Sequence, residues 1–460
     1  IIYLILPDHL IPYQINITGG DAPSYRYFDF SNLNEILSSH RTFGLPLIIR
    51  FYEMFSETLY LWPQVNFIFF SLSCLFFLYS LLKTDFNKLF SFFFVIGLFG
   101  SYNLYFFFKG WTELFSVSFI IFATSFFLLS LKYKKIYLYI LTTFLLFYTY
   151  QIRPSFVVYI FFFPSYIFFK NLLDKINFKI VLLNLIRISL LSILPFIIFI
   201  FLRMLITDHI GITPFAGVNI AGHATHYMEE KDIYSLSTKH EKFAKGVIDR
   251  KRKHVYPCNL FLNEIKELKL NPRKIKKQCF NIYVMSGWLE MIKQIKKLEP
   301  FPKNDPRNFN SWDHVETLGI FFTKTGNNNI IDRELSNYAW IIILKDHKKE
   351  YFTWFIISFY ESLILLFYSL KNLLFFYIFL IILFYLGKKL KFNDAKILPK
   401  INNVKALIFS ILLIQFLSLI LTSLTNIPYI RALSAQSIFL VPSLFAFIIL
   451  YFFYDKTKKI

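Results

Sequence analysis

The sequence has few of the residues on which several common kinds of site are built. It contains three cysteines, and no Cys/His spacing typical of a zinc site. Cys74 falls within an apolar stretch, whereas Cys258 and Cys279 share a hydrophilic segment that is equally compatible with a disulfide and with two free thiols. Neither common glycine-rich phosphate-binding pattern occurs, which argues against an ATP-driven pump or a nucleotide-sugar enzyme built on such a motif.

Acidic residues are also scarce. The 29 Asp and Glu are outnumbered by 50 Lys and Arg, for a formal net charge of +21. Most of the excess lies in short loops between apolar stretches and in one long hydrophilic segment. The charge therefore does not imply a nucleic-acid partner, and anionic lipid headgroups are the nearer one.

Apolar residues dominate what is present. Hydrophobic residues make up 56% of the chain, Phe alone numbers 60, and the mean hydropathy is +0.49. The Phe excess accompanies many Ile, Lys and Asn residues, as expected from an AT-rich genome, so it argues for no aromatic cage. Many apolar runs approach the roughly 20 residues needed to cross a bilayer. The composition predicts an all-α polytopic membrane protein.

The apolar runs predict nine crossings, two of which are short for a bilayer. They are expected at residues 63–82, 89–108, 113–131, 136–151, 154–170, 180–206, 372–387, 404–424 and 430–453. The further apolar stretch 349–370 is expected to lie along the outer interface or to pack into the bundle. A crossing there would put the basic loop that contains Lys388 and Lys400 on the outer side of the membrane.

Lysine placement predicts orientation, because Lys and Arg are retained on the cytoplasmic side. One set of loops is basic and is assigned to the cytoplasm with the C-terminus; it contains Lys83, Lys88, Lys132, Lys134, Lys135, Lys170, Lys175, Lys179, Lys388, Lys389, Lys391, Lys396, Lys400, Lys456, Lys458 and Lys459. The alternating set carries only Lys109, Arg153 and Arg431 near the membrane. It is expected to face the periplasm or exterior of an inner (plasma) membrane.

Four regions follow from this topology. They are an external first loop (1–62), a transmembrane bundle (63–206), an external segment with short amphipathic helices (207–349), and an interfacial helix with C-terminal crossings (350–460). The opening "IIYLIL" reads like the end of a helix leaving the bilayer. It predicts one more crossing before residue 1, with signal-peptide cleavage as the alternative.

Ionisable residues at the expected outer edge are candidate functional residues. Lys109 and Glu113 lie at an outer helix start, and Arg153 lies at an outer turn before Pro154. Arg431 lies just inside the last crossing. Lys and Arg at helix ends often have no functional role and simply extend their charged groups into the membrane interface. Of the three basic residues, Lys109 is the one that this structural interpretation fits best.

Several stretches, taken in order, resemble a known family. They are "GDAPSY", "HRTFGLPLIIRFY", "WTELFSVSFIIFA", "IRPSFVVYIFFFP" and "RALSAQSIFLVPSLFAF". Their order and sidedness resemble the GT-C superfamily of lipid-sugar-dependent glycosyltransferases. The nearest likeness is to bacterial members related to the protein O-mannosyltransferases and to the lipopolysaccharide-core glycosyltransferases of rhizobia. Most of 207–349 lies outside the resemblance.

The resemblance implies a GT-C-like bundle that transfers a sugar, with inversion, from a polyprenyl-phosphate donor to a hydroxyl of a glycan, lipid or protein acceptor. Asp21 of the first loop matches the position of the catalytic base. Arg153 and Arg431, with Lys109, are expected to bind the departing phosphate, since guanidinium groups suit that anion.

Other residues of the same loops are expected to contact sugar or acceptor. They are Tyr25, Tyr27, Glu113 and His40. Ala22 stands where many relatives carry a second acid, so Asp29 or Glu113 is the candidate substitute and a divalent metal is left open. A turn role after Gly19 and Gly20 is the competing interpretation of Asp21.

Two other functions remain open. An O-antigen polymerase or ligase would depend more on His223 and His226 in the external segment. A lipid or glycan transporter would favour inverted repeats and mid-helix charges. No repeat is evident, and the clearest mid-helix charge is Arg187.

Overall fold

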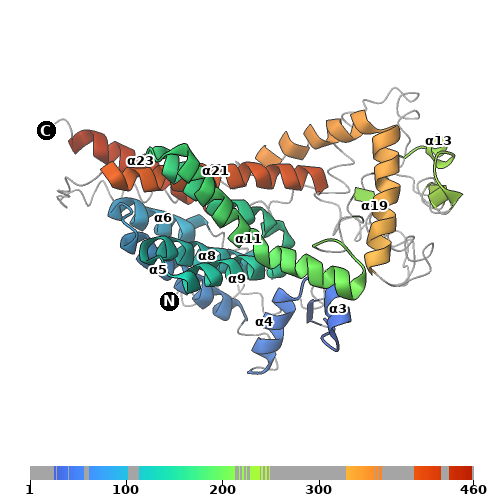
Figure 1. Ribbon diagram of the computed structural model, residues 1–460, viewed down its shortest axis with the longest axis horizontal. Coiled ribbons are helices and arrows are strands. Elements are labelled where there is room, and N and C mark those ends of the chain that lie inside the picture. Colours follow the sequence, from blue (N-terminus) through green and yellow to red (C-terminus); the bar gives the residue numbers. More distant parts are fainter. Residues whose placement is uncertain are drawn as a thin grey trace, which may run out of the picture.

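The computed structural model describes a helical protein. The described residues are 25–26, 28–39, 41–55, 62–101, 113–212, 217, 220–221, 224, 228–238, 240–241, 244–245, 248, 328–356, 358–360, 362–364, 398–425 and 435–457. Within these ranges all regular structure is helical. Figure 1 shows a bundle of long helices, with α19 (Asn328–Lys345) and α13 (Glu230–Ile233) beyond one of its ends.

Five helical stretches within the described part of the chain are long and apolar enough to cross a membrane. They belong to α5 (Trp62–Lys83), α8 (Glu113–Tyr133), η3 with α10 (Pro154–Phe161 and Phe162–Leu173), α11 (Phe178–Thr207) and α21 (Leu398–Thr425). Each agrees closely with a crossing predicted from the sequence. The 30 residues of α11 span about 45 Å, more than the roughly 30 Å of bilayer hydrocarbon.

The prediction of nine crossings was wrong for the described residues. The helices α6 (Lys88–Ser101), α9 (Ile136–Ile152) and α23 (Leu440–Thr457) have shorter apolar parts than the five long stretches. α9 has nearly the bounds predicted from the sequence, but its 17 residues fall short of the roughly 20 that span a bilayer. α23 starts ten residues later than expected, because 437–439 form a turn. The crossing predicted at 372–387 lies outside the described residues, as do the amphipathic stretches within 251–327.

Aromatic packing joins the bundle across long sequence separations. α8 packs between α5 and α9, α10 packs against α11 and α21, and α6 packs on α23. Phe439, from the turn before α23, lies 5.8 Å from Phe77 of α5 and 6.1 Å from Phe162 of α10, between ring centroids. The abundant Phe thus fills the space between helices.

One end of the bundle, here called the lysine end, gathers the short basic loops. Lys132 donates to Asp85 at 2.8 Å, joining the ends of α8 and α5. The Asn402 amide near the start of α21 donates to the Asp174 carboxylate at 3.0 Å. Loops that the sequence predicted on one side of the membrane therefore share one end of the bundle.

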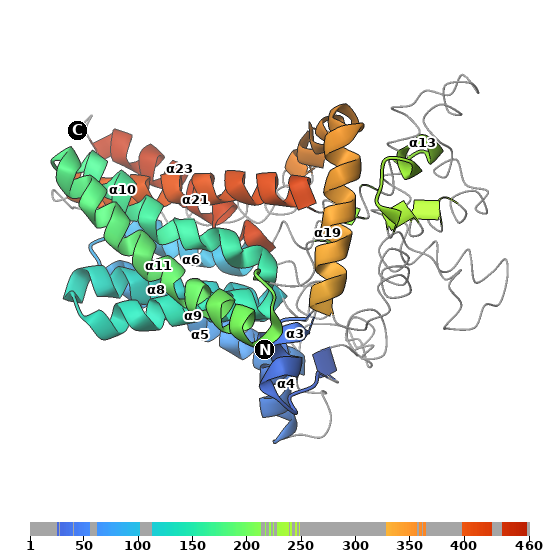
Figure 2. The same ribbon diagram turned by 45° about the vertical axis from the view of Figure 1, so that its right-hand side comes forward.

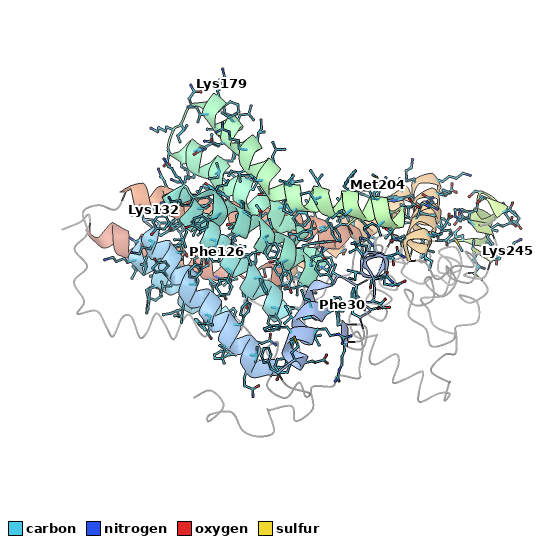
Figure 3. All side chains as sticks on the ribbon, turned by 60° about the horizontal axis from the view of Figure 1, so that its bottom comes forward. Phe30, Phe126, Lys132, Lys179, Met204 and Lys245 are labelled. Carbon is cyan, nitrogen blue, oxygen red and sulfur yellow. The ribbon has the colours of Figure 1, made fainter. Side chains whose placement is uncertain are left out.

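The opposite end, here called the arginine end, carries Arg153 and the helix α4 (Gly44–Glu53). The Tyr148 hydroxyl of α9 donates to the carbonyl of Gly44 at 3.0 Å. Figure 3 shows Lys179 and Met204 near opposite ends of α11, and Figure 2 shows the Met204 end beside α3 (Leu33–Ser38) and α4. The two classes of loop are thus separated by the length of the bundle.

A smaller unit lies beyond the arginine end and has a core of its own. The core combines Ile220, Met228 and Ile233 with Leu335, Tyr338 and other residues of α19. The buried Arg203 near the end of α11 donates to the carbonyl of Ile212 at 2.6 Å and to the Asn329 side chain at 3.3 Å. This arginine ties the smaller unit, here called the α13–α19 unit, to the bundle.

Three histidines lie near carboxylates in and beside this unit. His240 is hydrogen-bonded to Glu334 at 3.2 Å and His347 to Asp232 at 2.8 Å, whereas His209 lies 3.9 Å from Asp332. Burial, with the charges of Arg203 and Arg333, lowers the pKa of His209 to about 4. Neutral His209 is therefore the stable form at neutral pH.

The helical residues that follow this unit return to the bundle. Tyr351 donates to the carbonyl of Leu424 at 2.7 Å, and the ring of Phe359 lies 6.2 Å from that of Phe416. The first part of the predicted interfacial stretch 349–370 thus packs along α21.

Candidate functional site

The Glu113–Arg153 ion pair is the central charged feature of the arginine end. Glu113 is the first residue of α8, where a carboxylate is favoured by the helix dipole. Arg153 has an extended backbone between α9 and η3, and Pro154 begins η3. The sequence break at Pro154 therefore turns Arg153 back toward the start of α8, and its Nη1 donates to Glu113 Oε1.

The two partners are buried to different degrees. Their side chains are 2% exposed for Glu113 and 16% exposed for Arg153. The partly exposed member of the pair is therefore Arg153. This arrangement leaves the arginine side chain partly accessible at the end of the bundle, while the buried carboxylate holds its guanidinium in place.

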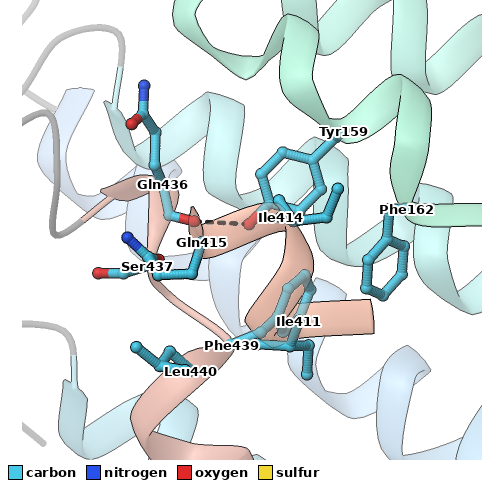
Figure 4. A pocket seen from close by; sticks show the side chains of 9 residues that line it. All are labelled: Tyr159, Phe162, Ile411, Ile414, Gln415, Gln436, Ser437, Phe439 and Leu440. Atoms are coloured by element: carbon cyan, nitrogen blue, oxygen red, sulfur yellow. Dashed lines mark hydrogen bonds between the residues drawn. The ribbon is translucent and has the colours of Figure 1, made fainter. Parts of the chain in front are cut away.

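A short chain of hydrogen bonds links Arg153 to the last helical segment. Arg153 Nε donates to Ser155 Oγ at 3.2 Å, and the Gln436 amide donates to the carbonyl of Ser155 at 3.3 Å. Figure 4 shows the Tyr159 hydroxyl donating to the Gln436 carbonyl, at 2.7 Å. The segment that follows Arg431 in sequence thus packs directly on the Arg153 turn.

The first-loop helix α4 covers the same end. Leu45, Ile49 and Tyr52 of α4 form one cluster with Trp62, Phe115 and Ile152, at the ends of α5, α8 and α9. Gly44 lies so close to α9 that a Cβ there would come within 2.5 Å of the Gln151 carbonyl carbon. Only glycine allows this approach of the two backbones.

Tyr25 belongs to this end through Arg41. The Arg41 guanidinium carbon lies 5.0 Å from the centre of the Tyr25 ring, and its Nη1 donates to the Tyr25 hydroxyl at 3.5 Å. Tyr25 also packs against the α4 cluster. The tyrosine predicted to contact sugar therefore lies near the helix that covers the arginine end.

Asp29 has the geometry of a turn residue. Its carboxylate accepts the backbone N–H of Ser31 at 2.7 Å in an exposed loop before α3. Hydrogen bonds from the Ser31 backbone and side chain lower the pKa of Asp29. A carboxylate with a lowered pKa is a weaker base at neutral pH.

The structure brings together only part of the predicted site. Arg153 and Glu113 are in contact, and Tyr25 lies at the same end of the bundle. The following predicted site residues lie outside the described residues: Asp21, Tyr27, His40, Lys109, Arg431, His223 and His226. Their predicted roles remain predictions.

Three polar residues at this end were not predicted from the sequence. Gln436 supports the Arg153 turn, Arg41 covers Tyr25, and Gln151 is fully buried where Gly44 packs. Neither carboxamide atom of Gln151 has a hydrogen-bond partner within the described structure. A glutamine inside an apolar stretch was the sequence feature that could have pointed to two of these residues. Gln151 lies two residues before Arg153, and Gln436 lies five residues after Arg431.

A narrow pocket lies between η3, α21 and the start of α23. Its empty space of about 170 Å³ includes open solvent and leaves no room even for a water molecule, whereas ligand pockets typically hold roughly 300–1,000 Å³. Figure 4 shows the residues that line it, which are Tyr159, Phe162, Ile411, Ile414, Gln415, Gln436, Ser437, Phe439 and Leu440. Its size and largely apolar lining do not suit a lipid-linked sugar. Among the described residues, no group of three or more potential ligands could hold a metal ion.

Comparison with known proteins assigns no family. No family model matches the chain, and no curated protein and no solved structure matches it significantly.

Proposed function

We propose that the chain is an integral-membrane glycosyltransferase that uses a polyprenyl-phosphate-linked sugar at the arginine end of the bundle. The observation that carries the proposal is the Glu113–Arg153 pair, in which the glutamate is buried and the arginine is partly accessible. It lies opposite the lysine end, where the positive-inside rule places the cytoplasm. A lipid phosphate at the outer leaflet would meet this guanidinium.

The proposed reaction is one inverting displacement. The acceptor hydroxyl oxygen attacks the anomeric carbon, the bond from that carbon to the phosphate oxygen breaks, and polyprenyl phosphate leaves. The hydroxyl proton passes to Asp21, the first-loop acid that matches the base in the resembling family. Inversion follows because attack and departure occur on opposite faces of the sugar.

Arginine is suited to stabilising the phosphate that leaves in this reaction. Negative charge accumulates on the phosphate as it departs, and a preorganised guanidinium stabilises that charge without reorganising. Glu113 and Ser155 orient Arg153 through two of its nitrogens. Arg431 is proposed to contribute a second guanidinium from the segment that leads to Gln436.

Binding of polyprenyl phosphate, compared with uncharged polyprenol, tests the proposal. Removing Arg153 alone would take this ion pair away from the buried Glu113 carboxylate, so the informative variant is Glu113→Gln with Arg153→Gln, which removes both charges. We expect a roughly 10- to 100-fold loss of affinity for polyprenyl phosphate and no change for polyprenol. Native mass spectrometry of the purified full chain measures both.

The Lys132–Asp85 pair offers a matched control at the lysine end. It is an exposed ion pair, so Asp85→Asn with Lys132→Gln also removes one charge of each sign and should leave polyprenyl phosphate affinity unchanged. Wild-type affinity in the folded Glu113/Arg153 double variant would refute the phosphate site. An equal loss of affinity in the Asp85/Lys132 double variant would show that binding is not specific to the Arg153 site and would refute it as well.

A further inference from the structure

Helix α4 has two apolar faces, only one of which packs against other residues in the part of the chain that the structure describes. Leu45, Ile49 and Tyr52 are buried against the ends of the long helices. On the opposite face, Phe51 is 63% exposed and Met54 is 78% exposed. Leu47 extends this exposed row at helical spacing, and Met54 and Phe55 continue it in the turn directly after α4, where the ring of Phe55 lies 5.2 Å from that of Phe51.

The position of α4 along the length of the bundle indicates what covers this exposed face. Its buried side contacts Trp62, the first residue of α5, and Ile152, the last residue of α9. The 22 residues of α5 span about 33 Å, close to the thickness of bilayer hydrocarbon. The end of α5, and with it α4, therefore lies at a hydrocarbon boundary.

The direction of α4 fits that level. Figures 1 and 2 both show α4 leaving the end of the bundle at a steep angle to α21, one of the long apolar helices. A helix that crosses the bundle direction at the boundary lies along the membrane surface. Amphipathic helices in this position bury one apolar face among acyl chains.

The exposed face is also continuous with a surface that faces lipid. Little of α11 is buried within the protein, although the helix is long and apolar enough to cross a membrane. Phe43, at the start of α4, packs 6.5 Å from Phe199 of α11 between ring centroids. Arg50 is exposed beside Leu47 and Phe51, where its guanidinium can reach lipid phosphates above the inserted apolar row.

We propose that α4 is an interfacial membrane helix, with the face formed by Leu47, Phe51, Met54 and Phe55 inserted into the leaflet at the arginine end. Arg50 contacts the phospholipid headgroups of that leaflet. This proposal does not depend on the glycosyltransferase activity. Because α4 packs on α9 directly beside the Arg153 turn, this lipid contact of the first loop would also fix how deep that turn lies in the membrane.

Depth-dependent quenching in proteoliposomes tests the insertion. In a full chain whose native cysteines Cys74, Cys258 and Cys279 are replaced by serine, Phe51→Cys carries an environment-sensitive fluorophore. Met54→Cys supplies a second position on the same face. Tyr234→Cys is the matched control, because Tyr234 is an 87% exposed aromatic residue in the α13–α19 unit.

Lipids with a nitroxide high on the acyl chain should quench the labels at 51 and 54 several-fold more than the label at 234. Aqueous iodide should show the reverse order. Equal iodide quenching at 51, 54 and 234 would overturn the proposal. Protection of 51 and 54 from both quenchers, lost when protein is diluted into excess lipid, would show that a second copy covers the face and would also overturn it.

Discussion

Arg153 and Glu113 form an ion pair although 40 residues of chain separate them. The intervening chain crosses the bundle twice, along α8 to the lysine end and back along α9. The pair therefore closes a helical hairpin at the arginine end. It fixes the start of α8 against the turn between α9 and η3, where α4 also packs.

Removing one charge of this pair should destabilise the protein much more than removing both. Glu113→Ala leaves a partly buried guanidinium without its carboxylate and should lower the free energy of unfolding by about 3–5 kcal/mol. Replacing both residues by Gln should cost much less, because neither charge is then unpaired. Thermal unfolding of the purified chain measures both effects.

The Lys132–Asp85 pair provides the comparison for this experiment. Its side chains are 43% and 65% exposed, so Lys132→Ala should change the free energy of unfolding by less than about 1 kcal/mol. A Glu113→Ala loss as small as that of Lys132→Ala would contradict a structural role for the pair.

Cysteine labelling should place the two ends of the bundle on opposite sides of the membrane. Single cysteines at Lys134 and Lys175 should react only with a reagent that enters the cytoplasm, and one at Ser31 only with an impermeant reagent added outside. These positions lie in loops at the lysine end and before α3. Labelling of 31 and 134 from the same side would refute the orientation and the proposed outer-leaflet reaction together.

Gly44→Ala should displace α4 from α9. The added Cβ would meet the Gln151 backbone at 2.5 Å, and backbone cannot rotate away as a flexible side chain can. We expect a loss of about 1–3 kcal/mol of stability. Leu47→Ala, on the exposed face of the same helix, is the control and should be nearly neutral in detergent. Equal melting temperatures for Gly44→Ala and wild type would show that α4 is not packed as described.

Acid should loosen the α13–α19 unit before the bundle. His209 has a pKa of about 4 in the folded protein against 6.5 ordinarily, because burial and then the charges of Arg203 and Arg333 disfavour its protonated form in spite of nearby Asp332. The stability contributed by neutral His209 is therefore complete above pH 6.5 and is lost as pH falls toward about 4. At about 1.4 kcal/mol per pKa unit, it amounts to roughly 3 kcal/mol.

Asp232 adds to the acid sensitivity at lower pH. Burial alone would raise the pKa of this carboxyl, but hydrogen bonds from His347 and the Glu229 backbone outweigh burial and lower it. Its contribution is present above the ordinary value of 3.8 and is lost as pH falls below that value. Its pH window therefore lies below that of His209.

Hydrogen exchange of residues 328–345 in the full chain, corrected for intrinsic rates, should show the His209 effect between about pH 7 and about pH 4.5. His209→Gln should abolish this change in protection, whereas His240→Gln, in the neighbouring pair, should retain it. An unchanged pH dependence in His209→Gln would contradict the assignment.

Asp21 and Asp29 should differ in their effect on sugar transfer. Asp21→Asn keeps the side-chain shape and removes the base, so transfer in membranes should fall about 10²- to 10⁴-fold. Asp29→Asn should have little effect, since Asp29 occupies an exposed turn and has a lowered pKa. The opposite pattern would make Asp29 the base, and normal transfer in both variants would refute the proposed mechanism.

The helical class, the apolar stretches and the grouping of the basic loops could all be predicted from the sequence alone. Apolar length is a local property, so the crossings that became α5, α8, α10, α11 and α21 were visible without knowledge of their neighbours. The same criterion overstated the number of crossings. It counted α9, whose 17 residues fall short of the roughly 20 that span a bilayer, and it does not register that the chain turns before α23 begins.

Tertiary structure decided which charged residues meet. Nothing local in the sequence pairs Glu113 with Arg153 or brings Gln436 to the Ser155 carbonyl, because these contacts depend on how α8, α9 and the last segment pack. The two faces of α4 were likewise indistinguishable by composition, since both are apolar. Only packing against Trp62, Phe115 and Ile152 determines which face is buried and which remains exposed.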